Sequence, residues 1–239
     1  MVCVITDNSY IYEGFKALIE NKKNKYKFYY SENNRLFNDL YRNNEEFSPI
    51  SLKKCDPSTF DQYEMILSLH CKQIFPEWLV NNHRCINVHP GLNPYNRGWF
   101  PQTFSIINKL PAGVTIHEMD TELDHGPIIY QERLEIHSYD TSKDVYERIL
   151  KVELELIKNH LDDLVNGTYT THPMDTEGNI NYKSDFDLEC RLDLDKTGTF
   201  SDFYDLLRAL TFPPYKNAYF IDENGEKIYI SLNISKSNE

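Results

Sequence analysis

Roughly the first 165 residues alternate short apolar runs with stretches whose apolar side chains recur at helical spacing. The apolar runs predict strands at residues 2–6, 26–30, 65–69, 85–88, 114–119 and 128–136. The helical spacing predicts helices at residues 10–20, 76–80, 101–107 and 142–165, and the polar segment 33–47 is expected to combine a helix with loops. Strands that alternate with helices form a sheet covered on both faces. We therefore expect an α/β fold for this part of the chain.

The pattern changes near residue 170. Residues 175–205 are acidic and poor in long apolar runs. A short helix is expected at 200–210, followed by strands at 218–221 and 227–232 that join through an Asp-Glu-Asn-Gly-Glu turn, a hairpin signal. The sequence thus predicts two regions, residues 1–170 with the sheet and residues 171–239 with a small helix and a β-hairpin.

Composition narrows the class of protein. The chain has 25 Lys+Arg against 37 Asp+Glu, a formal net charge of −12, which argues against broad nucleic-acid binding. A small anionic substrate held by a few local cations stays possible. No apolar run approaches the ~18 residues of a membrane span, and the N-terminus lacks the basic segment of a signal peptide. The five cysteines include no CxxC pair, which fits a reducing cytoplasm rather than a disulfide framework or a zinc ribbon.

Glycine positions exclude two common nucleotide-binding motifs. No two of the nine glycines have the spacing of a GxGxxG fingerprint or of a P-loop. Most NAD enzymes and P-loop NTPases are therefore disfavoured.

The densest polar segment follows the strand predicted at 85–88. Asn87 and His89 are two residues apart, so a strand presents both on one face, and Pro90-Gly91 then turns the chain. Ligands of open α/β sheets bind at the carboxyl ends of the strands. A carboxylate-rich loop follows the strand at 114–119, and the segment between is long enough for a helix and a return strand that would bring Asp124 beside His89.

An amide, an imidazole and a carboxylate together suit acyl transfer to an amine. The amide donates to an oxyanion, the imidazole moves protons near neutral pH, and the carboxylate orients the imidazole and favours its charged form. No Ser, Cys or Lys stands out as a covalent nucleophile, so direct attack by a substrate amine is the simpler scheme. By spacing alone, however, a His at a strand end is more often structural, and an Asp before Gly-Pro is most often a turn residue.

These motifs, taken in order, resemble the formyltransferase family that uses 10-formyltetrahydrofolate. The matching pattern is Asn87-x-His89-Pro-Gly-Leu, then Arg97-Gly, then Gly-Val-Thr-Ile-His-x-Met-Asp at 113–120, then Asp124-x-Gly-Pro-Ile. The resemblance implies a Rossmann-like formyltransferase fold with a central, mostly parallel sheet. It further implies that Asn87, His89 and Asp124 are catalytic, that 10-formyltetrahydrofolate is the co-substrate, and that no metal is needed.

The same resemblance places the folate. Residues 69–76 look like the pterin-binding hinge of the family, which implies folate contacts from Cys71, Lys72 and Ile74. The loop that carries Asp120, Glu122 and Asp124 is expected to close the other side of the ring.

The remaining sequence indicates which substrate accepts the formyl group. A short, acidic C-terminal region disfavours tRNA. Residues 95–102 and 207–220 resemble the dTDP-amino-sugar N-formyltransferases, dimeric enzymes of O-antigen and lipopolysaccharide biosynthesis, although the Thr-Phe-Pro-Pro-Tyr stretch at 211–215 replaces a more polar turn. The resemblance implies a homodimer that acts on a dTDP-amino-dideoxyhexose. We expect dTDP-4-amino-4,6-dideoxyglucose, with a dTDP-3-amino-3,6-dideoxyhexose as the alternative.

Several residues suit such an acceptor. Tyr95, Trp99 and Phe100 offer aromatic surface for thymine, and Arg97 and Lys72 offer cations for the diphosphate. All but Tyr95 have an ordinary alternative: Trp99 and Phe100 as core, Arg97 paired with a surface carboxylate, and Lys72 in solvent.

Three other functions compete with a sugar formyltransferase. A formyltetrahydrofolate hydrolase would carry an additional domain before this core, and the first strand begins at Val2. A metal-dependent hydrolase built on His89, Asp124 and His125 lacks any HExxH or CxxC spacing. A nucleotide-binding module without catalysis is disfavoured by the complete Asn87, His89 and Asp124 set.

Overall fold

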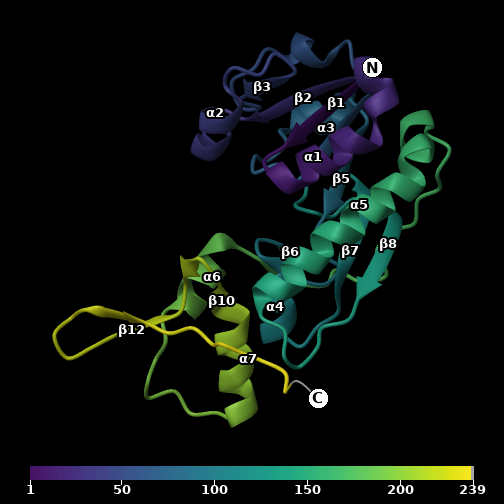
Figure 1. Cartoon of the computed structure of the whole chain (residues 1–239). Coiled ribbons are helices and arrows are strands. Elements are labelled where there is room, and N and C mark those ends of the chain that lie inside the picture. The colour runs from purple at the N-terminus through teal and green to yellow at the C-terminus, as the bar shows by residue number, and fades with distance from the viewer. Residues whose placement is uncertain (238–239) are drawn as a thin grey trace.

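The computed structural model describes residues 1–237 and centres on a seven-stranded sheet with the strand order β3-β2-β1-β4-β5-β7-β8 (Figure 1). Strands β1 to β5 run parallel to one another, whereas β7 pairs antiparallel with both β5 and β8. The bounds are β1 Val2–Thr6, β2 Tyr26–Ser31, β3 Phe47–Ile50, β4 Met65–Leu69, β5 Cys85–His89, β7 Ala112–Glu118 and β8 Ile128–Leu134. The predicted Rossmann-like fold with a mostly parallel sheet is confirmed.

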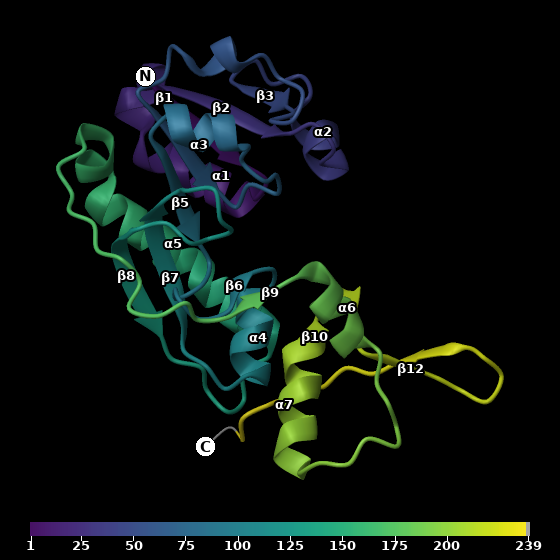
Figure 2. The ribbon, with the colours of Figure 1, turned by 180° about the vertical axis from the view of Figure 1, so that it is seen from behind.

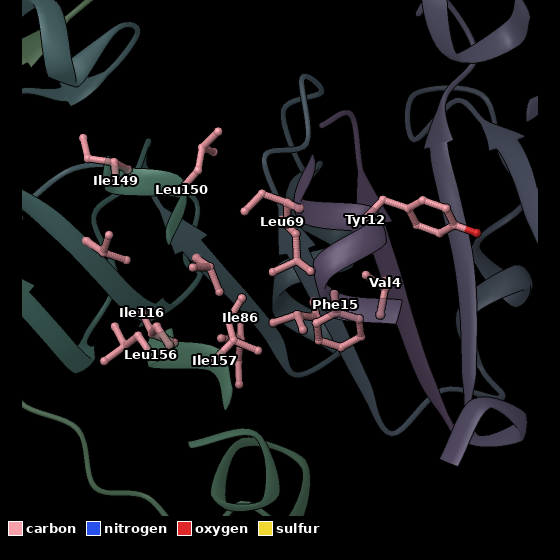
Figure 3. Packing of buried hydrophobic residues seen from close by; sticks show 14 of the residues in the cluster. Val4, Tyr12, Phe15, Leu69, Ile86, Ile116, Ile149, Leu150, Leu156 and Ile157 are labelled. Atoms are coloured by element: carbon pink, nitrogen blue, oxygen red, sulfur yellow. The ribbon is translucent and has the colours of Figure 1, made fainter. Parts of the chain in front are cut away.

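Alternation along β1 divides the core between the two faces of this sheet. Val2 and Val4 pack into a cluster with α1 Ser9–Leu18 and α5 Ser142–Asn166, whereas Cys3 and Ile5 pack on the opposite side with α3 Glu77–Asn82 and the 3-10 turn Pro57–Phe60. Figure 3 shows Val4, Phe15 and Leu69 facing the α5 side chains of the larger cluster. Because both faces are buried, the strands of the parallel part read as continuous apolar runs.

The 25-residue helix α5 lies along the sheet (Figure 1) and has sharply defined ends. Thr141 and Asp144 form a capping box at its start, and Gly167 ends it in the left-handed region at φ 69°. Its buried side chains, such as Val145, Ile149 and Leu156, recur at helical spacing against the sheet. Residues in the middle of this helix thus lie close to the carboxyl ends of the central strands.

The strand order reverses at β1. The chain passes from β1 outward to β2 and β3, and then returns to add β4 and β5 on the other side of β1. Ligands of open α/β sheets bind outside the carboxyl ends at such a switch point. Here that edge carries the segments after Thr6, Leu69 and His89.

The C-terminal part contains α6 Lys183–Cys190, α7 Phe200–Leu210 and two small hairpins. Helix α7 packs on α4 Pro101–Ile107. A further two-residue strand, β9 Ile180–Asn181, pairs with β6 Arg97–Gly98 (Figure 2). The hairpins are β10 Thr211–Phe212 with β11 Tyr215–Lys216, and β12 Tyr219–Ile221 with β13 Lys227–Tyr229. The predicted helix and C-terminal β-hairpin are both present.

Four predicted elements keep the predicted bounds: β1, β4, α4 and α7. The polar segment 33–47 holds α2 Arg35–Tyr41, as expected, but its last residue begins β3, a strand that the pattern did not predict. Strand β3 contains Pro49, which only an edge strand tolerates. Helix α6 was also missed, because its apolar positions are few and the surrounding residues are acidic. Within residues 1–237, no helix combines the length and the apolar character needed to cross a membrane.

Candidate active site

Three polar side chains meet at the carboxyl end of β5. Asn87 Nδ2 donates a hydrogen bond to Asp124 Oδ1 at 3.0 Å, and His89 Nδ1 lies 3.4 Å from Asp124 Oδ2. Asn87 and His89 are buried, and the Asp124 side chain is 12% exposed. The carboxylate thus stands between the amide and the imidazole, the juxtaposition that the sequence predicted.

Asp124 is held in place from three directions. Besides the bond from Asn87, its Oδ2 accepts the backbone N–H of Gly98 at 3.0 Å, and its own carbonyl accepts Asn93 Nδ2 at 2.8 Å. Its φ of 47° lies in the left-handed region, which Asp adopts more readily than most residues. Each carboxylate oxygen is therefore presented to one of the other two side chains in a fixed orientation.

Gly98 can fill this role only because it has no side chain. Its φ is 89°, and a Cβ there would lie 2.4 Å from the carbonyl oxygen of Asn181 on β9. Any other residue would push β6 away from β9 and withdraw the N–H from Asp124.

The two ring nitrogens of His89 differ, because Nδ1 faces Asp124 and Nε2 has no hydrogen-bond partner among residues 1–237. The nearby carboxylate favours a proton on Nδ1, which leaves the lone pair on Nε2. Nε2 is also buried. It lies against Gly91, where a Cβ would be 2.4 Å away. Buried nitrogens without a partner are rare, so Nε2 is the natural contact for a bound substrate.

His117 supports the amide of Asn87 from the neighbouring strand. The two residues are paired in the β5–β7 register. His117 Nδ1 donates to the carbonyl of Glu118 at 2.7 Å, so its Nε2 accepts, and that atom lies 3.3 Å from Asn87 Nδ2. Both N–H bonds of the Asn87 amide are therefore occupied, one by Asp124 and one, at the longer distance, by His117.

Burial sets the protonation of both imidazoles. It lowers the pKa of His89, although Asp124 acts in the opposite direction, and it lowers the pKa of His117 in the same way. Asp124 does favour the charged form of His89, as expected, but removal from water has the larger effect on the pKa. At neutral pH His89 is a neutral proton acceptor.

The residues predicted to bind folate are spread along the same edge. Cys71 is half-buried with its Sγ near the backbone of Gln73, and burial raises its thiol pKa to about 12, so it is an inert contact rather than a nucleophile. Lys72 and Ile74 are exposed. In the second loop, Asp120 accepts the backbone N–H of Glu122 and contacts His125 Nδ1 at 2.7 Å. Side chains from both segments thus remain accessible on the surface.

The residues predicted to bind the acceptor differ in burial. Tyr95 and Trp99 are exposed, whereas Phe100 packs on Phe186 of α6 with ring centroids 4.1 Å apart. Arg97 is buried, donates to the carbonyl of Leu123 at 3.5 Å, and lies 4.0 Å from the exposed Glu177. Trp99 therefore has free aromatic surface, while Phe100 is held within the contact with α6.

The loop between β5 and α4 is fixed by a set of asparagines. Asn96 Oδ1 accepts hydrogen bonds from the amides of Asn108, Asn179 and Asn181 at 2.9, 2.9 and 3.3 Å. Asn96 has a φ of 50°, where Asn is favoured over most other residues. Two of the three donors come from the segment around β9, so that segment braces the loop that carries Arg97 and Trp99.

His117, Gly91 and Gly98 support the site but were not predicted to do so. The sequence does place His117 in an adjacent strand, but its pairing with Asn87 depends on the strand register, which spacing alone does not give. Nothing in the Pro90-Gly91 turn indicated that Gly91 would face an imidazole. Among residues 1–237, no group of three His, Cys, Asp or Glu side chains is arranged to hold a metal ion.

Comparison with known proteins adds to this geometry. A formyl transferase family model matches residues 1–161, and an N-formyltransferase dimerization C-terminal domain matches residues 185–236. A dTDP-4-amino-4,6-dideoxyglucose formyltransferase from Mycobacterium tuberculosis is 52% identical over 172 residues, which cover 72% of this chain and 74% of that protein.

Solved structures agree with these relatives. A 4-N formyltransferase from Francisella tularensis has a TM-score of 0.94 at 46% identity and is covered over 98% of both chains. An N-formyltransferase from Helicobacter canadensis, in complex with folinic acid and dTDP-3-aminofucose, has a TM-score of 0.73 at 21% identity, covering 91% of this chain and 82% of that one. The second likeness shows a shared fold.

Proposed function

Because the chain belongs to the formyl transferase family, we propose that it moves a formyl group from 10-formyltetrahydrofolate to the amine of dTDP-4-amino-4,6-dideoxyglucose. The observation that carries this proposal is the meeting of Asn87, His89 and Asp124 within a chain that is 52% identical to an enzyme of that name. The formylated sugar would serve O-antigen or lipopolysaccharide biosynthesis, as a cytoplasmic step.

His89 is the group proposed to move a proton in this reaction. Attack of the amine on the formyl carbon leaves a positive charge on the nitrogen and a negative charge on the oxygen. The neutral imidazole, with its free Nε2, can accept a proton from that nitrogen and return it to N10 of the departing folate. Asp124 stabilises the imidazolium that forms in between.

Asn87 is proposed to stabilise the oxyanion. Its Nδ2 donates to Asp124 at 3.0 Å and contacts His117 at 3.3 Å, so the second hydrogen is the one held less firmly. The amide hydrogens are fixed in the plane of the group, so we propose that the oxyanion shares this hydrogen with His117 while the bond to Asp124 is kept. An oxyanion donor of this kind contributes roughly 10²–10³ in kcat.

The carboxyl edge offers accessible groups for both substrates. We propose that the segment with Cys71, Lys72 and Ile74 and the loop with Asp120 and Glu122 bind the folate. Trp99 and Tyr95 have exposed rings suited to the thymine. Lys72 is the exposed cation for the diphosphate, while the buried Arg97 adds positive charge beneath the loop.

We propose that residues 171–239 mediate homodimerisation. The β12–β13 hairpin projects from the rest of the chain (Figures 1 and 2). Ile221, Ile228 and Tyr229 on it are exposed, and the region falls within the match to a dimerization domain. Apolar side chains on an isolated two-stranded hairpin need a partner surface to be stable.

The test is an assay with 10-formyltetrahydrofolate and a panel of dTDP-4-amino and dTDP-3-amino dideoxyhexoses, read by mass spectrometry for the gain of one formyl group. The proposal expects dTDP-4-amino-4,6-dideoxyglucose to react most efficiently. Preference for a dTDP-3-amino sugar would reassign the acceptor, and formyl release without transfer would indicate a hydrolase. Replacing His89 by Ala should abolish most turnover, and Asn87→Ala should lower kcat more than it changes KM.

A further inference from the structure

A second imidazole–carboxylate pair stands at the same edge of the sheet. His70 follows β4 directly, one residue beyond the Leu69↔Val88 pair that joins β4 to β5, and thus lies level with His89. His70 Nε2 lies 2.6 Å from Oε2 of Glu153, a residue in the middle of α5. The pair therefore links the helix behind the sheet to the strand next to the proposed catalytic imidazole.

Glu153 occupies a position where an apolar residue would be expected. It is 0% exposed, on the buried face of α5 among Ile149, Leu156 and Ile157, and its Oε1 has no hydrogen-bond partner within residues 1–237. A buried carboxylate costs stability unless it is fully paired, and an apolar side chain of similar volume is often as stable or more so. Packing alone therefore gives no reason for Glu153.

His70 also adopts an unfavourable backbone conformation. Its φ is 58°, in the left-handed region, which is uncommon for residues other than Gly, although His, Asn and Asp adopt it more often than the rest. Strain of this kind collects at functional sites. Here it accompanies the contact with Glu153.

The contact with Glu153 determines which nitrogen of His70 is free. A carboxylate oxygen accepts, so Nε2 carries the proton that it donates, and Nδ1 is left as the acceptor. Nδ1 has no hydrogen-bond partner in the described chain and is not among its buried unpaired atoms, so it contacts solvent. A nitrogen base supported by a buried carboxylate thus opens on the edge where substrates bind.

Two groups from neighbouring elements face this pair. From α5, Tyr146 has its ring 6.0 Å from that of His70, and its hydroxyl accepts a hydrogen bond from Asn8 Nδ2 at 2.8 Å. From β5, His89 is close enough for the charge of His70 to affect its pKa. The charges that act on His89 are those of Asp124, His70 and Arg97.

The proposed reaction needs a second proton acceptor. The amine of an amino sugar has a pKa of ~8, so it arrives mainly as an ammonium with three protons, and the amide product keeps one. One of the two protons lost is delivered to N10 of the folate through His89, and the other must leave before the nitrogen can attack. Among the charged neighbours of His89, Arg97 cannot accept a proton, and Asp124 already accepts hydrogen bonds from Asn87 and Gly98.

On the basis of the proposed function, we propose that His70, supported by Glu153, is the base that deprotonates the incoming ammonium. The N–H bond of the ammonium breaks, and its proton binds Nδ1 of His70 while Nε2–H stays with Glu153. The freed amine then attacks the formyl carbon, and His89 transfers the second proton to N10. His70, whose side chain is 12% exposed, returns its proton to solvent.

The test compares pH profiles of kcat/KM for the amino sugar in the wild type, His70→Asn and Glu153→Gln. Asn is chosen because it tolerates the left-handed conformation. In the wild type, kcat/KM should change little between about pH 7 and about pH 8, since the enzyme deprotonates the ammonium. In His70→Asn only the free amine reacts, so kcat/KM should rise about tenfold per pH unit below the amine pKa and approach the wild-type value above it. Glu153→Gln, which keeps the shape but not the charge, should show the same change at lower amplitude.

The control is His160→Asn, which removes a histidine of α5 that stacks on Tyr130 with ring centroids 3.6 Å apart. Its pH profile should match the wild type. Thermal unfolding of each variant reports on folding, and if His70→Asn fails to fold, Glu153→Gln carries the test. The proposal is overturned if both variants keep the wild-type profile, or if they lose the same factor at every pH.

These outcomes are separate from the test of the function. If the wild type formylates no amino sugar, the proposed function fails. If the wild type is active and the His70→Asn profile equals its own, only the role of His70 fails.

Discussion

Gly91 lies directly against the imidazole of His89, and one added methyl group there tests the role proposed for that ring. A Cβ at this position would lie 2.4 Å from His89 Nε2 and 2.8 Å from Cδ2, with Pro101 Cβ at 3.2 Å behind it. The φ of Gly91 is not in the left-handed region, so the backbone itself accepts alanine. The main effect of Gly91→Ala therefore falls on the contact with the imidazole, with a smaller overlap against Pro101.

The size of that effect follows from the overlap. Ordinary carbon–nitrogen contacts begin near 3.4 Å, so the ring must withdraw by about 1 Å. His89 is enclosed, so Nε2 can move only by rotating out of its present position. A misplacement of ~1 Å at a reacting group costs roughly 10²-fold in rate, which corresponds to about 2.7 kcal/mol of transition-state stabilisation.

The assay is steady-state formyl transfer, with kcat and KM measured separately, beside thermal unfolding. Gly91→Ala should lower kcat about a hundredfold while KM for folate stays near the wild-type value. Gly14→Ala is the matched control, because its Cβ would also lie 2.4 Å from a neighbour, the half-buried side chain of Leu154. That variant should lose stability, by about 1–3 kcal/mol, but keep its kcat. A Gly91→Ala enzyme with unchanged kcat would show that the position of Nε2 does not matter to catalysis.

Three further predictions concern the framework of the site. Burial lowers the folded-state pKa of His89 and His117, so the unfolded chain binds more protons than the folded chain below pH ~6.5. The free energy of unfolding should therefore be highest above this pH and fall on acidification by about 1.4 kcal/mol per pH unit for each of the two histidines. In urea unfolding from pH 7.5 down to 5.5, His117→Gln should remove one histidine's share of that slope; a slope equal to the wild type contradicts the assignment. Asn96→Ala leaves three amides without their acceptor, those of the buried Asn181, the half-buried Asn179 and the exposed Asn108. It should reduce the unfolding free energy by about 3 kcal/mol in denaturant titration, whereas a loss below about 0.5 kcal/mol would show that the network contributes little. Arg208 donates to the carbonyls of His137 and Asp140 at 3.1 and 2.8 Å and to the Asp205 carboxylate at 2.7 Å. Arg208→Ala should therefore lower the unfolding free energy by about 3 kcal/mol, and Arg208→Lys should recover less than half of that loss. A lysine variant as stable as the wild type would argue against the importance of the guanidinium group.

The sheet could be predicted because its signals are local. The apolar runs that become β1 and β4 are buried on both faces, and the proline at the start of α4 marks a helix beginning. Strand β3 could not be predicted in the same way, because its Pro49 argues against a strand, and only its pairing with β2 at the edge of the sheet allows it.

The proposed catalytic residues could be predicted from the sequence for a different reason. Asn87 and His89 are two apart in one strand, and the length of the returning segment permits Asp124 to reach them. The contact between His70 and Glu153, by contrast, joins residues far apart in the sequence, and nothing local distinguishes Glu153 from the other acidic residues of α5. The register between β5 and β7, which pairs Asn87 with His117, likewise depends on tertiary contacts.

Asn179 and Asn181 hold the loop between β5 and α4, so the catalytic region depends on residues of the C-terminal region. The strand that pairs with β6, and two of the three amides that donate to Asn96, lie beyond the boundary expected near residue 170. A graft that exchanged the C-terminal region for another would take with it part of the scaffolding under Arg97, Gly98 and, through the Gly98 N–H, Asp124. A chimera designed for a new acceptor should therefore be joined after Asn181, so that the recipient keeps its own β9 strand and its own hydrogen bonds to Asn96.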